Sequence, residues 1–174
     1  MESKGFRYEA AQLVLDYGYR TLVEVGVWEG DLSALLYPLA DQLILVDPWS
    51  VGWNRFPHQS EIYECTMGLP FKNQNELDLM YQQVTAQFPK AVVLRMSSVE
   101  AAKSIPDHSV DFVYIDAVHT YEHCKADILA WLPKIRPGGM IAGDDYYKPH
   151  NAVSRAVDEL FGPQDTDRSW SVMI

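Results

Sequence analysis

The sequence VEVGVWEGDLS, residues 23–33, runs from an apolar strand-like segment into a helix-like one through two glycines, Gly26 and Gly30. Glycine permits a tight turn and a close approach of a ligand to the backbone, because it has no Cβ. The G-x-x-x-G spacing is not the G-x-G-x-x-G of dinucleotide-binding proteins, so the glycines alone are equally typical of an ordinary turn. The stretch predicts a strand, a turn and a helix.

Further apolar segments of strand length follow along the chain. The five predicted strands cover residues 21–26, 42–47, 91–95, 110–116 and 139–144. They are rich in Val, Ile and Leu and lack a clean alternation of apolar and polar residues. This pattern is typical of strands that are covered on both faces.

Helical patterns separate or follow these strands. Apolar residues recur at helical spacing in three stripes: Leu77, Met80, Tyr81, Val84 and Phe88; Tyr121, Cys124, Ile128, Trp131 and Leu132; and Val153, Ala156, Val157, Leu160 and Phe161. Asn73 and Glu76 predict a cap for the first helix, while Pro133 and Gly162 end the other two. Alternating strands and helices predict a doubly wound α/β fold, with a mostly parallel sheet and helices on both faces. We expect residues 1–174 to form one three-layer domain.

Composition narrows the class of partner. The net charge of −10 argues against nucleic acid or an anionic membrane as a partner. The apolar runs are too short to span a bilayer, and no signal peptide precedes the first residues, so the sequence predicts a cytoplasmic protein. Cys65 and Cys124 are far apart in the sequence and are expected to be reduced thiols.

Acidic residues gather at the predicted carboxyl ends of the strands. Glu24 lies near the end of the first strand, Asp47 ends the second, Asp116 the fourth, and Asp144 with Asp145 follows the fifth. In open parallel sheets, ligands bind beyond the carboxyl ends of the strands. We therefore expect the functional site at this edge.

The chemistry of these residues favours a cationic nucleoside. Carboxylates at Glu24 and Glu29 would serve a pyrophosphate poorly and a positively charged ligand well. Asp47 can accept two hydrogen bonds from a ribose diol. S-adenosylmethionine combines a ribose with a positive charge.

Four segments carry a family resemblance: EVGVxxG, LILVDPW, VDFVYIDAVHTYEHCKADI and LPKIRPGGMIAGDDY, in this order between about residues 20 and 160. They resemble the class I S-adenosylmethionine-dependent methyltransferases, and more narrowly the metal-dependent small-molecule O-methyltransferases of the catechol and macrolide-sugar type. The resemblance implies that Glu24 contacts the methionine end of the cofactor, Gly26 and Gly30 shape the turn, and Asp47 holds the ribose. It also implies that Ser98 lies near the adenine and that Asp116 borders the cofactor.

Two features depart from that family. Ser97 stands where a glycine is frequent. Residues 169–174, SWSVMI, supply one terminal strand where the fold usually has a hairpin. The departures concern the far edge of the sheet more than the cofactor site.

Three aspartates and a histidine are the candidate catalytic residues. Asp116, Asp144 and Asp145 follow neighbouring strands, so we expect their carboxylates to converge, and the resemblance implies a metal ligand at each position. Carboxylate oxygens suit Mg²⁺ first, with Mn²⁺ or Ca²⁺ as alternatives. The competing interpretation is that the aspartate pair is solvated in a loop. His119, in IDAVH, corresponds to the general base of macrolide-sugar methyltransferases, with Asp116 beside it as a second catalytic residue.

Two other functions remain open. His119, Glu122 and His123 also spell H-x-x-E-H, an inverted zinc-hydrolase motif, for which Glu159 is the available downstream ligand. A non-catalytic S-adenosylmethionine- or nucleoside-binding module would keep the cofactor site without turnover. Our prediction is methyl transfer to a hydroxyl of a small molecule or sugar; the acceptor and any homo-oligomeric state are left open.

The connection over residues 48–72 is long enough to be a lid or an acceptor-binding loop. Its aromatic residues, Trp49, Trp53, Phe56 and Tyr63, either cover the acceptor or pack on the sheet. Tyr146 and Tyr147 are further candidates for the acceptor pocket.

Overall fold

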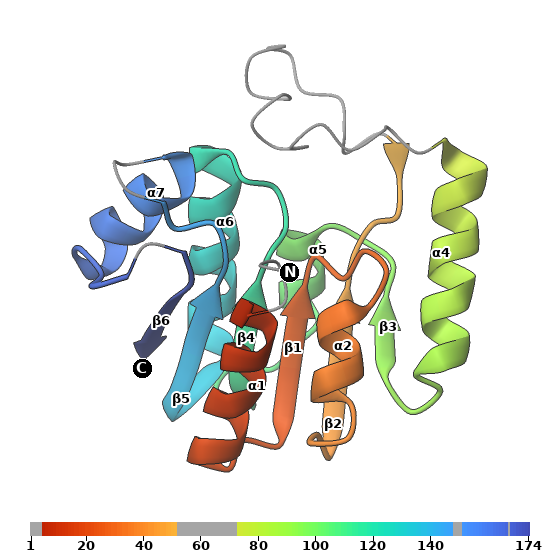
Figure 1. Ribbon diagram of the computed structural model, residues 1–174, viewed down its shortest axis with the longest axis horizontal. Coiled ribbons are helices and arrows are strands. Elements are labelled where there is room, and N and C mark those ends of the chain that lie inside the picture. The colour runs from red at the N-terminus through yellow and green to blue at the C-terminus, as the bar shows by residue number, and fades with distance from the viewer. Residues whose placement is uncertain (1–4, 52–72, 148–150, 167) are drawn as a thin grey trace.

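The computed structural model describes residues 5–51, 73–147, 151–166 and 168–174. Strands and helices alternate along the chain (Figure 1). The strands are β1 (Thr21–Val25), β2 (Gln42–Val46), β3 (Val92–Leu94), β4 (Val110–Ile115), β5 (Ile135–Gly143) and β6 (Trp170–Met173). The helices are α1 (Gly5–Tyr17), α2 (Asp31–Leu36), α4 (Gln74–Gln87), α5 (Ser98–Lys103), α6 (Tyr121–Trp131) and α7 (Ala152–Phe161), with a 3₁₀ turn, η2 (Leu132–Lys134).

The strands form one sheet in the order β3-β2-β1-β4-β5-β6. The first five strands pair in parallel, and β6 pairs antiparallel with β5. All five predicted strands are confirmed, as is the single terminal strand over the last residues. The order reverses between β1 and β4, which places the carboxyl ends of these two strands side by side at the position where such folds bind ligands.

Helices cover both faces of the sheet, as predicted. One buried cluster joins α1, α2 and α4 to sheet residues such as Leu22, Leu45 and Phe112. The other joins α5, α6 and α7 to Val23, Val113 and their neighbours. Adjacent strand residues therefore alternate between two cores, and this explains why the strands show no polar face in the sequence.

The predicted helix ends are confirmed by their caps. Asn73 and Glu76 form a reciprocal capping box at the start of α4. Helix α6 ends before Pro133, and Gly162 follows α7 with a positive φ of 81°. Glycine tolerates this conformation better than other residues do.

Two expectations from composition concern membrane spans and thiols. In the described part of the chain, no helix has the length and apolar character that a membrane span requires. Cys124 is a buried, free thiol, whereas Cys65 lies outside the described residues.

Candidate functional site

The turn after β1 packs against the end of β4. The Gly26 N–H donates to the Val46 carbonyl at 2.9 Å, and its φ is 87°. A Cβ on Gly26 would lie 1.9 Å from the main-chain oxygen of Asp116. Gly30, with a φ of 85°, has the side chain of Phe88 2.9 Å from where its Cβ would be. The backbone conformation favours glycine at both positions, and at Gly26 the close main chain of Asp116 also requires it.

Glu24, in β1, is a buried carboxyl with one side-chain partner. The Ser33 hydroxyl donates to its Oε2 at 2.5 Å. Burial raises the pKa of Glu24 to about 8, against the lowering effect of the Ser33 hydrogen bond. The carboxyl is thus mostly protonated at neutral pH, and a cation beside it would favour the ionised form.

Asp47 joins the two turns that follow β1 and β2. Its Oδ2 accepts from the N–H groups of Val27 (3.1 Å) and Trp28 (3.0 Å), and its Oδ1 accepts from Trp49 (2.7 Å). Burial raises the pKa of Asp47, although these hydrogen bonds act in the opposite direction. An ionised carboxylate has about four acceptor positions, so the predicted ribose contact would share a side chain that already organises both turns.

The Ser98 hydroxyl faces helix α6. It accepts from the Trp131 indole at 3.0 Å and is hydrogen-bonded to Asp127. The predicted contact of Ser98 with adenine stays a prediction, and the hydroxyl would share it with Trp131. Ser97 caps α5 by accepting from the Glu100 N–H at 3.4 Å, which is a local reason for a serine where a glycine is frequent.

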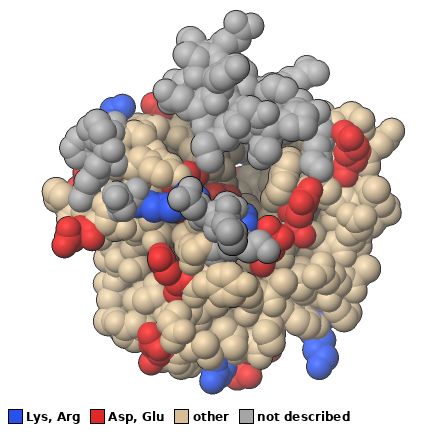
Figure 2. Space-filling view, in the orientation of Figure 1, with Lys and Arg blue, Asp and Glu red and all other residues tan. Residues whose placement is uncertain are grey.

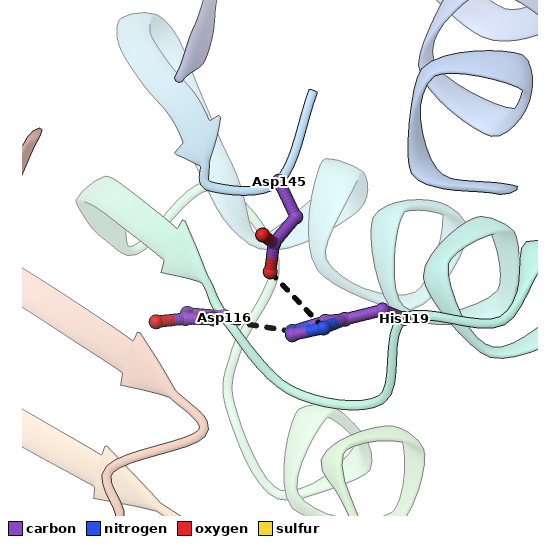
Figure 3. A group of neighbouring side chains, drawn as sticks. All are labelled: Asp116, His119 and Asp145. Carbon is purple, nitrogen blue, oxygen red and sulfur yellow. Dashed lines mark hydrogen bonds and ion pairs between the residues drawn. The ribbon is translucent and has the colours of Figure 1, made fainter. Parts of the chain in front are cut away.

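Asp116, His119 and Asp145 come together beyond the ends of β4 and β5 (Figure 3). His119 Nε2 lies 3.2 Å from Asp116 Oδ1, and its Nδ1 lies 3.0 Å from Asp145 Oδ2. One ligand atom from each of the three residues lies within 4.8 Å of the others. His119 thereby contacts both Asp116, from its own motif, and Asp145, from the end of the next strand.

The neighbouring aspartates Asp144 and Asp145 point to different partners. Asp145 has a left-handed backbone, with a φ of 61°, and its carboxylate meets His119. Asp144 Oδ1 instead lies 3.6 Å from Arg168 Nε. Burial, with the charge of Asp116, raises the pKa of Asp144 to about 7. Each carboxyl therefore has its own cationic or ionisable neighbour, and Asp144 is not part of the three-residue group.

His119 lies between two carboxylates, which changes its charge. Burial lowers the pKa of His119, but the hydrogen bond to Asp116 and the charge of Asp145 outweigh burial, so the net pKa is raised. A neutral imidazole can donate through only one nitrogen. Without a further cation, this geometry therefore favours the imidazolium.

The donor set fits a divalent cation. Asp116 and Asp145 offer carboxylate oxygens, which suit Mg²⁺, Ca²⁺ and Mn²⁺, while the His119 nitrogen would favour Mn²⁺ or a softer ion if it also bound. A cation would replace the imidazolium as the charge that offsets the two aspartates. The side chains present are thus compatible with a metal.

Within the described part of the chain, the residues of the inverted zinc motif do not gather into a group of potential metal ligands. Helix α6 begins after its cap Thr120, so His119 lies outside the helix that carries His123. His123 Nδ1 lies 2.7 Å from the Thr120 hydroxyl, and Glu159 is paired with Lys125. The residues of this motif therefore point to separate partners.

The aromatic candidates for the acceptor pocket differ in burial. Trp49 is buried, donates its indole N–H to the Trp28 carbonyl and packs on Tyr81, and Tyr146 is buried with its hydroxyl on Asp158. Tyr147 is partly exposed and is hydrogen-bonded to Asp145. Trp53, Phe56 and Tyr63, with the rest of 52–72, lie outside the described residues, so the lid remains a prediction.

The space-filling view shows acidic and basic side chains close together around a hollow near the middle of this face (Figure 2). Arg168, which contacts Asp144 near this edge, was not predicted as a site residue. It follows no predicted strand, and no local motif in the sequence indicates its role.

Comparison with known proteins supports the fold. The model of a methyltransferase domain family matches residues 23–146. The y4gI protein of Sinorhizobium fredii is 29% identical over 107 residues, which are 62% of this chain and 10% of that protein. The chain therefore spans only about a tenth of the length of that relative.

Solved structures share the fold at low sequence identity. The O-methyltransferase NovP has a TM-score of 0.64 and 16% identity, with 97% of this chain and 78% of NovP covered. CalS11, a TDP-rhamnose 3'-O-methyltransferase of calicheamicin biosynthesis, has a TM-score of 0.58 and 14% identity, with 97% and 80% covered. Because the family match covers more than half of the chain and includes β1, β2, β4 and β5, this protein belongs to the methyltransferase domain family and has the class I S-adenosylmethionine-dependent methyltransferase fold.

Proposed function

We propose that this domain transfers the methyl group of S-adenosylmethionine to a hydroxyl oxygen of a small molecule or sugar, with a divalent cation and with His119 as general base. The observation that carries the proposal is the contact of His119 with Asp116 and Asp145, at 3.2 and 3.0 Å, beside the Gly26 turn. Imidazole is the side chain best suited to proton abstraction near neutral pH. The O-methyltransferases with the same fold support a hydroxyl acceptor.

The methyl donor is proposed to lie over β1 and β2. Glu24 would favour the cationic methionine end, and Asp47 would accept from the ribose. The glycines at 26 and 30 keep side chains away from the turn. Since the Ser98 hydroxyl is bound to α6, an adenine contact there would fall to main-chain N–H groups in the first turn of α5, which have no intrahelical acceptor.

Asp116 and Asp145 are the proposed holders of the cation. When bound, a divalent cation lowers the pKa of a hydroxyl near it and so eases its ionisation. Asp144, expected as a third ligand, would have to exchange its contact with Arg168 for the ion. Its part in metal binding stays a prediction.

Proton transfer then depends on which of the two aspartates stays in contact with His119. One ring nitrogen can accept the hydroxyl proton only when the carboxylate facing it turns to another partner. The acceptor oxygen attacks the methyl carbon, the carbon–sulfur bond breaks, and S-adenosylhomocysteine leaves. The aspartate that remains on the other ring nitrogen stabilises the imidazolium that forms.

The direct test measures formation of S-adenosylhomocysteine with a panel of hydroxyl compounds. His119→Ala should reduce turnover roughly 10²- to 10⁴-fold, the usual contribution of a positioned base. His108→Asn is the matched control, because His108 is an exposed histidine with a positive φ of 54° that asparagine tolerates. Wild-type turnover in His119→Ala would remove the histidine from the mechanism. Cofactor binding without turnover of any acceptor would favour the non-catalytic binding module.

A further inference from the structure

Among the residues that the structure describes, the guanidinium of Arg168 has no hydrogen-bond partner. Its Nε is buried and unpartnered, and the Asp144 Oδ1 that faces it, at 3.6 Å, is also without a hydrogen bond. Across residues 5–51, 73–147, 151–166 and 168–174, no side chain or main-chain oxygen accepts a hydrogen bond from this guanidinium. Buried polar groups are rarely left unpaired, so such a group calls for a specific reason.

Two aromatic rings hold the guanidinium in place. Its central carbon lies 4.6 Å from the centroid of the Phe6 ring and 5.9 Å from that of Tyr147. The Arg168 carbonyl also accepts from the Tyr146 N–H at 2.7 Å, which fixes the backbone beside the end of β5. The side chain is 38% exposed, so part of this ordered group can reach a ligand.

Arg168 is one side chain away from the Asp116–His119–Asp145 group. Its neighbour Tyr147 is hydrogen-bonded to Asp145, and Asp144 precedes Asp145 in the chain. The strand order sets Arg168 apart from the proposed methyl donor: Asp47 follows β2, while Arg168 lies beside β5 and β6, on the opposite side of β4. This is the side that remains for the acceptor.

We propose that Arg168 is a specificity-determining residue that binds an anionic group, a carboxylate or a phosphate, carried by the hydroxyl compound that is methylated. The inference rests on the proposed function. A planar guanidinium presents paired N–H donors that match these anions. The net charge of −10 repels anions in general, so an anionic acceptor needs a local cation of this kind. In the competing role, Arg168 only neutralises Asp144. The protein would then bind anionic and neutral acceptors equally well.

The test compares matched ligands by calorimetry on the full chain saturated with S-adenosylhomocysteine. One arm pairs catechol with 3,4-dihydroxybenzoate, and the other pairs glucose with glucose 6-phosphate, so that carboxylate and phosphate are separated. In at least one arm the anionic ligand should bind the wild type about 10- to 100-fold more tightly, the usual effect of a hydrogen bond to a charged group. Arg168→Gln should abolish that preference, and Arg168→Lys should keep part of it.

Arg155→Gln is the control, because it removes another arginine that stacks on a tyrosine, Tyr121, between α6 and α7. It should leave the preference unchanged. The inference is overturned if the wild type binds the neutral and anionic members equally in both arms, or if the preference survives in Arg168→Gln. If Arg168→Gln does not fold, a full wild-type preference in Arg168→Lys overturns it instead. Binding of S-adenosylhomocysteine is measured first, so that its failure counts against the proposed function and not against Arg168.

Discussion

The α-carbon of Gly26 faces the main-chain oxygen of Asp116 so closely that a Cβ there would lie 1.9 Å from it. One glycine thus lets the β1 turn and the end of β4 meet, and the latter carries the first residue of the candidate site. The contact is local, yet it joins the proposed donor and acceptor halves of the site.

Gly26→Ala should therefore destabilise the fold by more than its backbone conformation alone explains. Gly138→Ala is the matched control, since Gly138 has a φ of 81° but nothing within 4 Å of an added Cβ. A left-handed alanine costs roughly 1–2 kcal/mol, and overpacking adds about 1–3 kcal/mol at Gly26. Urea unfolding of both variants measures the difference. Equal losses of unfolding free energy would mean that the Gly26 contact relaxes without cost.

The strands and most helix ends could be predicted because each depends on a short segment. Runs of Val, Ile and Leu fixed the five parallel strands, and Asn73 with Glu76 fixed the start of α4. Helix α1 was not predicted, since two of its four buried residues are alanines, Ala10 and Ala11, which give a weak apolar stripe. Local pattern is informative where it is strong and repeated.

The candidate site was predictable only as far as topology determines it. Strand ends brought Asp116, His119 and Asp145 to one edge, but the direction of each side chain depends on contacts that are distant in sequence. The separation of Asp144 from this group follows from the left-handed Asp145 backbone and from Arg168 near the other end of the chain. The hydroxyl of Ser98 is likewise turned to Trp131 by helix packing.

Asp47→Ala should weaken the binding of S-adenosylmethionine and of S-adenosylhomocysteine equally, by about 1–3 kcal/mol of binding free energy. The carboxylate is expected to hold the ribose, which both ligands share. It also accepts from Val27, Trp28 and Trp49, so the thermal midpoint should fall as well. Calorimetry below that midpoint measures affinity, with the exposed Asp41→Ala as control. Unchanged affinity for both ligands would remove the ribose assignment.

Binding of S-adenosylmethionine at pH 7 should release a proton from Glu24. The pKa of about 8 in the free protein leaves the carboxyl mostly protonated at pH 7, and a cation beside it lowers that pKa. Release should fade above about pH 9, where the free carboxyl is already ionised. Calorimetry in buffers with different ionisation enthalpies counts the protons. Glu24→Gln should bind S-adenosylmethionine without releasing this proton. Identical proton release in the variant would assign the proton to another group.

Metal binding should depend on Asp145 more than on Asp144. Asparagine tolerates the left-handed backbone at position 145, so Asp145→Asn changes the charge without adding strain. We expect it to weaken Mn²⁺ binding at least tenfold, and Asp144→Asn to weaken it less, because Asp144 lies beside Arg168. Manganese titration followed by electron paramagnetic resonance gives both affinities. The reverse ranking would make Asp144 the principal ligand.

The pH dependence of turnover tests the position of His119 between two aspartates. The neutral imidazole is the base, so kcat/KM should rise with pH through a single ionisation and then level off. Asp116 and Asp145 raise the pKa of His119 above its ordinary value, which moves this rise to higher pH when the cation is subsaturating. Asp145→Asn removes one of the two charges and should shift the midpoint to lower pH, while raising the divalent cation from subsaturating to saturating should shift the wild-type midpoint in the same direction. Turnover should also stop in excess chelator and return with Mg²⁺ or Mn²⁺.

The informative contrast is between His119→Ala and Asp145→Asn, because the first should abolish the ionisation from the profile and the second should only move it. An ionisation that persists unchanged in His119→Ala belongs to another group, and the base must then be sought among the aspartates.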